Sequence, residues 1–360
     1  MAQLRVVLDQ LGPSATPDLA DASRALLAGL AETAPRGCTL EAIVPAGVDE
    51  PIEGVASVRR LALARRELAA AWQLGVAPGV GGGMIHSPTP LAPLVRHDRL
   101  NDHDQTVPTF WDLRAWVSPG SLPRGVVAWQ RGMLRRAARY ADAVVVPSHA
   151  IAERLAGLAP LGDRIRVIAG APDPRVRVPA DAADRRAEAS LPASYLVLDG
   201  PQGAPDALAP AFAAVATANT DVVVVDAAEG TEPAIAEIAA ASGVPAARVH
   251  VRERMDVDDR AAVLAGASAF VAADTAETWP WRLLEALTLG IPVVAIESAV
   301  HRDVVADGGR IVPGAELSAA LVDALEETSR RRLSVLAADR GRAFSWSGAA
   351  EQVWALHADL

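Results

Sequence analysis

This sequence of 360 residues has no lysine and almost no cysteine. All 34 basic residues are arginine, so the chain supplies neither a Schiff-base lysine nor the lysine of a P-loop. Pyridoxal phosphate enzymes are therefore excluded. The one cysteine, Cys38, excludes an intramolecular disulfide and a cysteine metal cluster. This cysteine usage fits a reducing compartment.

Excess positive charge and long apolar runs are also missing. A net charge of −10 and a pI near 5.2, without a long basic run, argue against a nucleic-acid partner. No segment approaches the length of a membrane span, and the start MAQLRVVLDQ lacks the pattern of a signal peptide. We therefore expect a cytoplasmic protein. A hydrophobic content of 51% over this length predicts two domains.

Short apolar strands alternate with helical patterns along the whole chain. Such alternation predicts two doubly wound parallel sheets of the Rossmann type. A segment at 172–192, rich in proline, arginine and aspartate, indicates an interdomain linker. We expect a first domain at 1–174, a linker at 175–192, a second domain at 193–340 and a closing helix at 341–360. Expected strands lie at 4–8, 40–44, 107–110, 165–168, 195–198, 222–225 and 249–251, and expected helices at 21–32, 58–74, 125–140, 207–216 and 232–242.

One βαβ unit, at 268–300, carries the clearest chemical signal. It consists of an apolar strand at 269–272, a helical pattern at 281–289 and a second strand at 292–296. Glu277 falls in the turn before the helix, and Glu285 lies on the helix. Between them the helix start offers free amides and a positive dipole end, which favour an anion such as a diphosphate. A sugar, a diphosphate and a ribose in a row would fit; the alternative is two glutamates on a solvated helix face.

The segment ETWPWRLLEALTLGIPVV, at 277–294, resembles the Glu-x7-Glu motif of family 4 glycosyltransferases, which is usually written EGFGLPxLEAxAxGxPVV. ADAVVVPSHA, at 141–150, resembles the end of that family's first domain. The resemblance implies an α/β protein with the GT-B fold, in which two Rossmann-like domains face a central cleft and the C-terminal helix crosses back to the first. It also implies a retaining transferase that uses a nucleotide-diphosphate sugar, with no metal and no further cofactor.

The resemblance implies roles for individual residues. Glu277 would contact the transferred sugar, Glu285 would bond the nucleotide ribose, and Asp112 would lie near the reacting sugar. Thr278 occupies a donor-loop glycine position, and Gly12 is the one glycine left of the turn after the first strand.

Arg282 is the nearest new cation to the expected diphosphate. A guanidinium there would oppose the charge of the leaving group. The alternative is a surface arginine paired with Glu285 or Asp274.

Two residues of the first domain are candidates for the acceptor side. Trp111 stands where the family has histidine, and it either stacks on a sugar ring or fills space. His86 ends a short strand, where it lies near an acceptor or is simply hydrogen-bonded. A carbohydrate or a glycolipid is the expected acceptor.

Two further groups of residues favour structural roles over binding roles. His97, Asp98, His103 and Asp104 have no standard metal-ligand spacing, so we expect turn formers and no metal. The arginines within 58–74 predict a solvated helix face, with peripheral contact to an anionic membrane as the alternative; they are Arg59, Arg60, Arg65 and Arg66.

The sequence departs from the family at four places. The turn after the first strand lacks its glycines, Trp111 replaces histidine, and Thr278 and Pro280 replace glycines of the donor loop. DGPQGAPDAL, at 199–208, lacks the Arg and Lys that neutralise the donor diphosphate. A second hypothesis is therefore a catalytically degraded relative that serves as partner subunit of a glycosyltransferase or binds a glycan. An epimerase acting on a nucleotide sugar ranks third.

Overall fold

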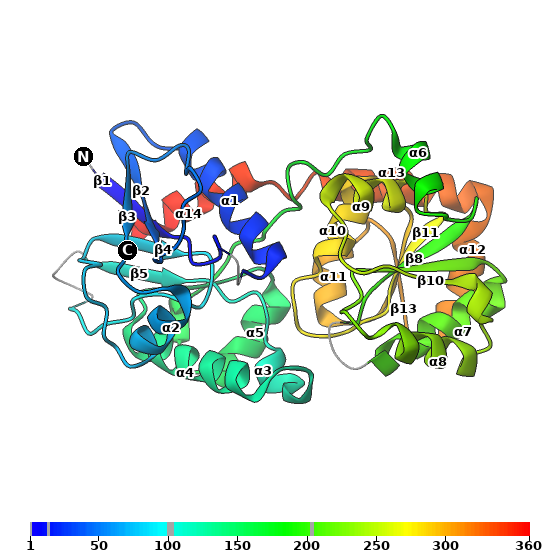
Figure 1. Cartoon of the computed structure of the whole chain (residues 1–360), viewed down its shortest axis with the longest axis horizontal. Helices are drawn as coiled ribbons and strands as arrows, with labels where there is room; N and C mark the ends of the chain where they lie inside the picture. The colour runs from blue at the N-terminus through cyan, green and yellow to red at the C-terminus, as the bar shows by residue number, and fades with distance from the viewer. Residues whose placement is uncertain (1, 13–14, 99–103, 202–204) are drawn as a thin grey trace. The chain divides into compact units, whose positions relative to one another are not determined.

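A computed structural model of the chain describes residues 2–12, 15–98, 104–201 and 205–360 (Figure 1). The chain forms two compact units, one of Met1–Ala171 with Ser345–Leu360 and one of Pro172–Phe344. Each unit contains its own parallel sheet with helices packed on it. The prediction of two doubly wound domains is therefore confirmed.

The first unit is built on a five-stranded parallel sheet of order β3-β2-β1-β4-β5. Its central strand β1 is buried from Leu4 to Val7, with Leu4 paired to Leu40 on one side and to Met84 on the other. A parallel pair, β6 and β7, adjoins the end of β5 through a bridge between Thr109 and Val145. The strands are β1 (Ala2–Val7), β2 (Cys38–Val44), β3 (Ser57–Arg60), β4 (Met84–Ser87), β5 (Gln105–Pro108), β6 (Val144–Val146) and β7 (Ile165–Val167).

Helices cover this first sheet because alternate strand residues are apolar on each face. Val7, Ile43 and Ile85 pack with Leu68 and Trp72 of helix α2. The helices of the first unit are α1 (Pro17–Glu32), α2 (Arg65–Gln73), α3 (Arg114–Val117), α4 (Arg124–Tyr140), α5 (His149–Leu158) and α14 (Trp346–Asp359), with short 3-10 turns at Pro119–Ser121 and Gly162–Arg164.

The C-terminal helix α14 returns to the first unit and packs along α1, as predicted. Figure 1 shows α14 in red beside the blue N-terminal elements of that unit. The Trp354 indole donates a hydrogen bond of 3.1 Å to the Leu30 carbonyl oxygen. A Cβ on Gly29 would lie only 2.7 Å from the Trp346 carbonyl oxygen, so glycine permits this close approach.

The second unit is built on a six-stranded parallel sheet of order β10-β9-β8-β11-β12-β13. The strands are β8 (Tyr195–Asp199), β9 (Asp221–Val225), β10 (Val249–Val251), β11 (Ala269–Ala272), β12 (Val293–Ile296) and β13 (Arg310–Val312). The helices are α6 (Ala182–Glu188), α7 (Ala209–Ala218), α8 (Glu232–Ala241), α9 (Val257–Ala265), α10 (Trp281–Thr288), α11 (Ala299–Val305), α12 (Leu317–Leu325) and α13 (Glu327–Gly341), with 3-10 turns at Pro205–Leu208, Ala246–Arg248 and Gly314–Glu316.

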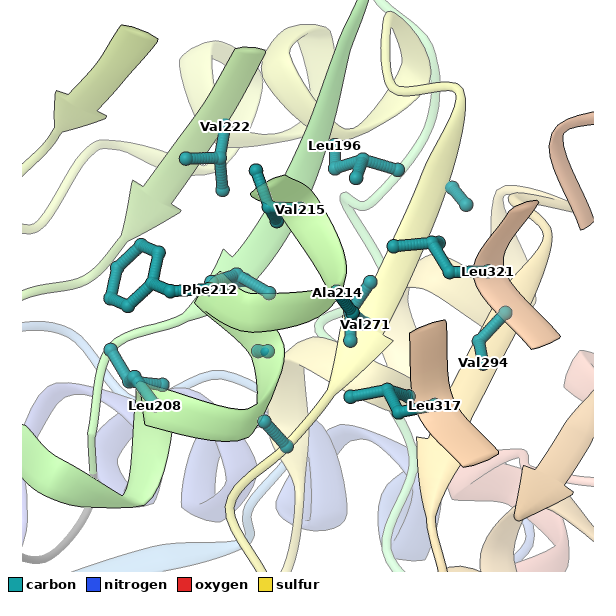
Figure 2. Packing of buried hydrophobic residues seen from close by; sticks show 14 of the residues in the cluster. Leu196, Leu208, Phe212, Ala214, Val215, Val222, Val271, Val294, Leu317 and Leu321 are labelled. Carbon is teal, nitrogen blue, oxygen red and sulfur yellow. The ribbon is translucent and has the colours of Figure 1, made fainter. Parts of the chain in front are cut away.

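A dense apolar core lies between this second sheet and helices α7 and α12. Figure 2 shows Phe212 and Val215 of α7 beside strand residues such as Val222, with Leu317 and Leu321 of α12 further along the same face. Helices α9, α10 and α13 form a second layer: α10 packs on β11 and β12, α13 packs on β12, and α9 and α13 both pack on α10. The two layers hold the ends of the strands in fixed positions.

Two local expectations differ from the structure. The range 58–74 is not one helix, because Ser57–Arg60 forms the edge strand β3 and the helix begins only at Arg65. Arg59 and Arg60 therefore do not share a helix face with Arg65. The range 175–192, expected as a linker, lies within the second unit and contains α6, which packs on α9.

Candidate functional site

The carboxyl end of the second sheet has a topological switch point between β8 and β11. These strands are neighbours, and the sheet grows outward from them in opposite directions. Ligands of open α/β sheets bind at such a point. Gly200 follows β8, where a Cβ would lie 2.7 Å from the Asp226 carbonyl oxygen. The chain after β11 is the loop that carries Glu277.

Glu277 lies half-buried in the loop between β11 and α10. Before it, the Asp274 carboxylate accepts a hydrogen bond of 2.8 Å from the Ala276 amide. After it, Trp279 is buried and packs edge to face on Trp281 and Phe344, with ring centroids 6.5 and 6.0 Å apart. This aromatic packing orders a loop that has no glycine between 273 and 280.

Helix α10 begins immediately after this loop. Its N-cap residue, Pro280, offers no side-chain cap to the amides of the first turn. Uncapped amides and the helix dipole favour an anion at this end. The second unit otherwise repels anions, because 16 of the 34 arginines and 26 of the 44 acidic residues lie in it, which places the whole net charge of −10 there.

Glu285 is held by two arginines inside the second unit. Arg260 of α9 donates from Nε to Oε2 at 2.9 Å and from Nη2 to Oε1 at 3.0 Å. Arg282, one turn before Glu285 on α10, donates from Nη1 to Oε1. The Nε of Arg282 also lies 2.9 Å from an oxygen of Asp226, which follows β9.

This four-residue network is buried and electrically balanced. Arg260, Arg282 and Glu285 are 2, 3 and 3% exposed, and the Asp226 side chain is 11% exposed. Two guanidinium groups face two carboxylates, so each charge is compensated within the unit. Arg282 thus pairs with Glu285, as the alternative to a diphosphate contact predicted. Unlike that prediction, Arg282 is buried and not on the surface, and its other carboxylate partner is Asp226.

The first unit holds Trp111 and Asp112 at the end of β5. The Trp111 indole is 6% exposed, donates a hydrogen bond of 2.7 Å to the Pro88 carbonyl oxygen, and packs edge to face on Trp346 with centroids 6.5 Å apart. This placement favours the space-filling role. The Asp112 carboxylate accepts hydrogen bonds of 2.7 Å from both the amide and the Nε of Arg114, which orients it at the start of α3.

His86 lies within β4 and faces His357 of α14. The two rings pack edge to face with centroids 5.6 Å apart, and both residues are almost fully buried. The His357 Nδ1 lies 2.8 Å from the Gln105 side-chain oxygen, whereas His86 Nδ1 and His357 Nε2 have no hydrogen-bond partner among the described residues. Burial lowers the pKa of His86 well below its usual value and lowers the pKa of His357 to about 4. Both rings are therefore neutral at pH 7.

Other sequence candidates have structural partners or lie apart. Thr278 follows Glu277 in the α10 loop, and Gly12 belongs to the first unit, where its φ of 153° suits glycine. His97 Nε2 lies 3.1 Å from the Asp142 carboxylate, and the Asp104 carboxylate accepts from the Gly83 amide. His103 lies outside the described residues. Among the described residues, no group of three potential ligands is arranged to hold a metal ion.

Sequence reasoning missed the partners of Glu285 and the polar cluster around Asp9. Arg260 directly precedes the apolar end of α9, residues 261–265, and a charged residue at this place is the one signal in the sequence of a buried charge that needs a partner. Asp9 follows the first strand, where its burial and its bonds to Thr89 and Arg65 depend on segments far away in the sequence.

Part of the second unit is similar to a known protein family. Residues 198–330 match the model of the family described as glycosyl transferases group 1, and this range includes the Glu277 loop, α10 and the Glu285 network. The match lies within the second unit and covers less than half of the chain. No curated protein matches the sequence.

Solved structures match the whole chain at low sequence identity. The sucrose-phosphate synthase from Thermosynechococcus elongatus has a TM-score of 0.66 and 18% identity, covering 100% of this chain and 99% of that one. Anabaena HepE in complex with UDP-glucose has a TM-score of 0.68 and 15% identity, covering 100% of both chains. WaaG, a glycosyltransferase involved in lipopolysaccharide biosynthesis, has a TM-score of 0.66 and 15% identity, covering 97% of this chain and 98% of that one.

These similarities show the GT-B fold for the chain. Together, the family match and the neighbouring folds support a glycosyltransferase, and they do not favour the degraded partner subunit. In the part of the chain that the structure describes, no helix is both long and apolar enough to cross a membrane.

Proposed function

We propose that the chain transfers a sugar from a nucleotide-diphosphate sugar to a carbohydrate or glycolipid acceptor, with retention of the anomeric configuration. The group 1 match over 198–330 carries the proposal, because it coincides with a glutamate loop and a helix N-terminus at the switch point of the second sheet. The complexes of Anabaena HepE with UDP and with UDP-glucose support a nucleotide donor.

Each part of the donor would meet a different feature of the second unit. Glu277, in the half-buried loop, would accept hydrogen bonds from hydroxyls of the transferred sugar. The amides at the start of α10, beside Thr278, would take the diphosphate and hold the charge that develops on the leaving group. Because acidic residues outnumber arginines in this unit, backbone amides are the better source of this stabilisation.

Glu285 has limited capacity left for the nucleotide ribose. A carboxylate offers about four lone-pair positions, and three are already occupied by hydrogen bonds from Arg260 and Arg282. We therefore propose one ribose hydrogen bond at Glu285 rather than a chelated diol. Arg282 then acts as a positioning residue that fixes Glu285, and not as the cation on the diphosphate.

The first unit would supply the contacts to the acceptor. Asp112, oriented by Arg114, remains our candidate for a catalytic contact, and Gly12 leaves room for close backbone approach. Trp111 and His86 are packed inside the first unit, which supports structural roles for both.

Transfer itself is tested with an α-configured nucleotide-diphosphate sugar and a panel of glycan acceptors. We expect release of the nucleoside diphosphate and a product whose new glycosidic bond is also α, because the transferase is proposed to retain configuration. Proton NMR of the anomeric signal distinguishes the two product anomers. A β-linked product would contradict retention, and the donor consumed without a product would indicate hydrolysis instead of transfer.

A further inference from the structure

A second switch point, in the first sheet, carries a polar cluster that no sequence motif indicated. It lies between β1 and β4, which are neighbours at the centre of the order β3-β2-β1-β4-β5. Asp9 follows β1 and Thr89 follows β4, and the Thr89 hydroxyl donates a hydrogen bond of 2.6 Å to Asp9 Oδ1. This bond spans the place where open α/β sheets bind ligands.

Asp9 is the buried centre of this cluster. It is 1% exposed, and its Oδ2 accepts from the Gln10 side-chain amide at 2.7 Å and from Arg65 Nε at 3.0 Å. Burial raises the pKa of Asp9 above its usual value, in spite of the nearby Arg65 charge and these hydrogen bonds. The Gln10 side-chain oxygen Oε1 in turn accepts from the Thr16 backbone amide at 2.8 Å. Each member of the cluster is thus held in place.

Arg65 is the charged side chain of the cluster that reaches solvent. It is the first residue of α2, its side chain is 31% exposed, and it contacts Asp9 through Nε. Within the described residues its two terminal Nη groups make no hydrogen bond. Other arginines of the same unit vary: both Nη groups of Arg5 and of Arg164 donate to backbone carbonyl oxygens, whereas Arg131, in the described part of the chain, donates through Nε alone.

We propose that Arg65 binds an oxyanion, a phosphate or a carboxylate, on the acceptor of the transfer reaction. A carboxylate that holds Nε from behind leaves the planar Nη fork preorganised for two parallel hydrogen bonds to such a group. The residues after β1 and β4 and the starts of α1 and α2 meet here, and they would position that oxyanion beside the switch point. That the oxyanion belongs to an acceptor rests on the proposed function. The anion site itself is a property of the first unit.

Binding of small probes to the full chain tests the site. The probes are glucose 6-phosphate, glucuronate and, as the neutral reference, glucose, each titrated by calorimetry. We expect at least one charged probe to bind tenfold or more tightly than glucose, and the better of the two identifies phosphate or carboxylate as the preferred group. Arg65→Gln should abolish the difference. Arg65→Lys, which keeps the charge beside Asp9 but lacks the fork, should also bind at least fivefold more weakly.

Arg66 provides the matched control. It follows Arg65 on α2, it is exposed, and Arg66→Gln makes the same change in net charge. Arg66→Gln should leave the affinity for the charged probe unchanged. Asp9→Asn should weaken this affinity severalfold, because an amide holds the Arg65 Nε less firmly than the carboxylate does. Three results would each overturn the site. The wild type would bind all three probes with equal affinity, Arg65→Gln and Arg65→Lys would bind the charged probe as the wild type does, or Arg66→Gln would lose as much affinity as Arg65→Gln.

Nucleotide titrations separate this inference from the proposed function. Arg65→Gln should bind a nucleoside diphosphate as the wild type does, because the nucleotide is assigned to the second unit. A chain that binds the charged probe through Arg65 but binds no nucleoside diphosphate would reject the proposed function and retain the anion site.

Discussion

Replacing Glu285 with alanine should lower the free energy of unfolding of the second unit by about 3–5 kcal/mol. The substitution leaves the guanidinium groups of Arg260 and Arg282 buried without the carboxylate that they share, while Asp226 still faces Arg282. Burying an uncompensated charge costs far more than losing a surface pair. The measurement is urea unfolding of the full chain at pH 7, with the free energy taken from the transition that the substitution shifts.

Two further variants show whether burial of the charge is the cause. The double variant Arg260→Met and Glu285→Met removes a whole ion pair and leaves Arg282 with Asp226, so it should cost less than Glu285→Ala alone. Glu297→Ala removes one partner of the exposed Arg302 pair and should cost no more than about 1 kcal/mol. A double variant less stable than Glu285→Ala would show that packing, and not charge compensation, sets the cost.

Acidification from pH 7 to pH 4 should remove about 3 kcal/mol of stability through His357 alone. The pKa of His357 is lowered to about 4 in the folded chain, against about 6.5 for an unfolded histidine. Below pH 6.5 the unfolded chain therefore binds a proton that the folded chain does not. The contribution is complete above pH 6.5 and is lost as the pH falls toward 4, and His86 acts in the same direction.

The measurement is the free energy of unfolding of the wild type and of His357→Phe at a series of pH values. Phenylalanine keeps a ring against His86 but does not titrate, so the variant should lose about 3 kcal/mol less than the wild type over this range. His149→Gln changes an exposed histidine and should follow the wild type. Parallel pH curves for the wild type and His357→Phe would show that the ring becomes protonated without cost.

The two sheets were predictable because buried parallel strands are short continuous apolar runs. Runs such as Val222–Val225 identify a strand without knowledge of its neighbours. The edge strand β3 was not predictable in this way, because Ser57–Arg60 is polar and mostly exposed, so its arginines joined the following helical pattern. An edge strand depends on its single partner, here β2, more than on its own composition.

The site was predictable only where its contacts are local. Arg282 and Glu285 are one helical turn apart, so their pairing was available as an alternative from spacing alone. The contact of Arg260 with Glu285 joins two helices, and that of Asp226 with Arg282 joins a strand end to a helix. Asp9, Arg65 and Thr89 likewise meet only because β1, α2 and β4 converge at one sheet edge. Sequence spacing contains no information on these pairs.

Calorimetric titration of the full chain with uridine, guanosine and adenosine diphosphates tests the central claim most directly, because the residues that match the group 1 family, 198–330, are proposed to bind a nucleotide donor. One of the three should bind at one site per chain. Its sugar conjugate should bind more tightly, and Glu277→Gln should remove this gain while leaving the affinity for the nucleoside diphosphate unchanged. Binding of none of the three, at concentrations up to millimolar, would contradict the assignment of a donor site to the second unit.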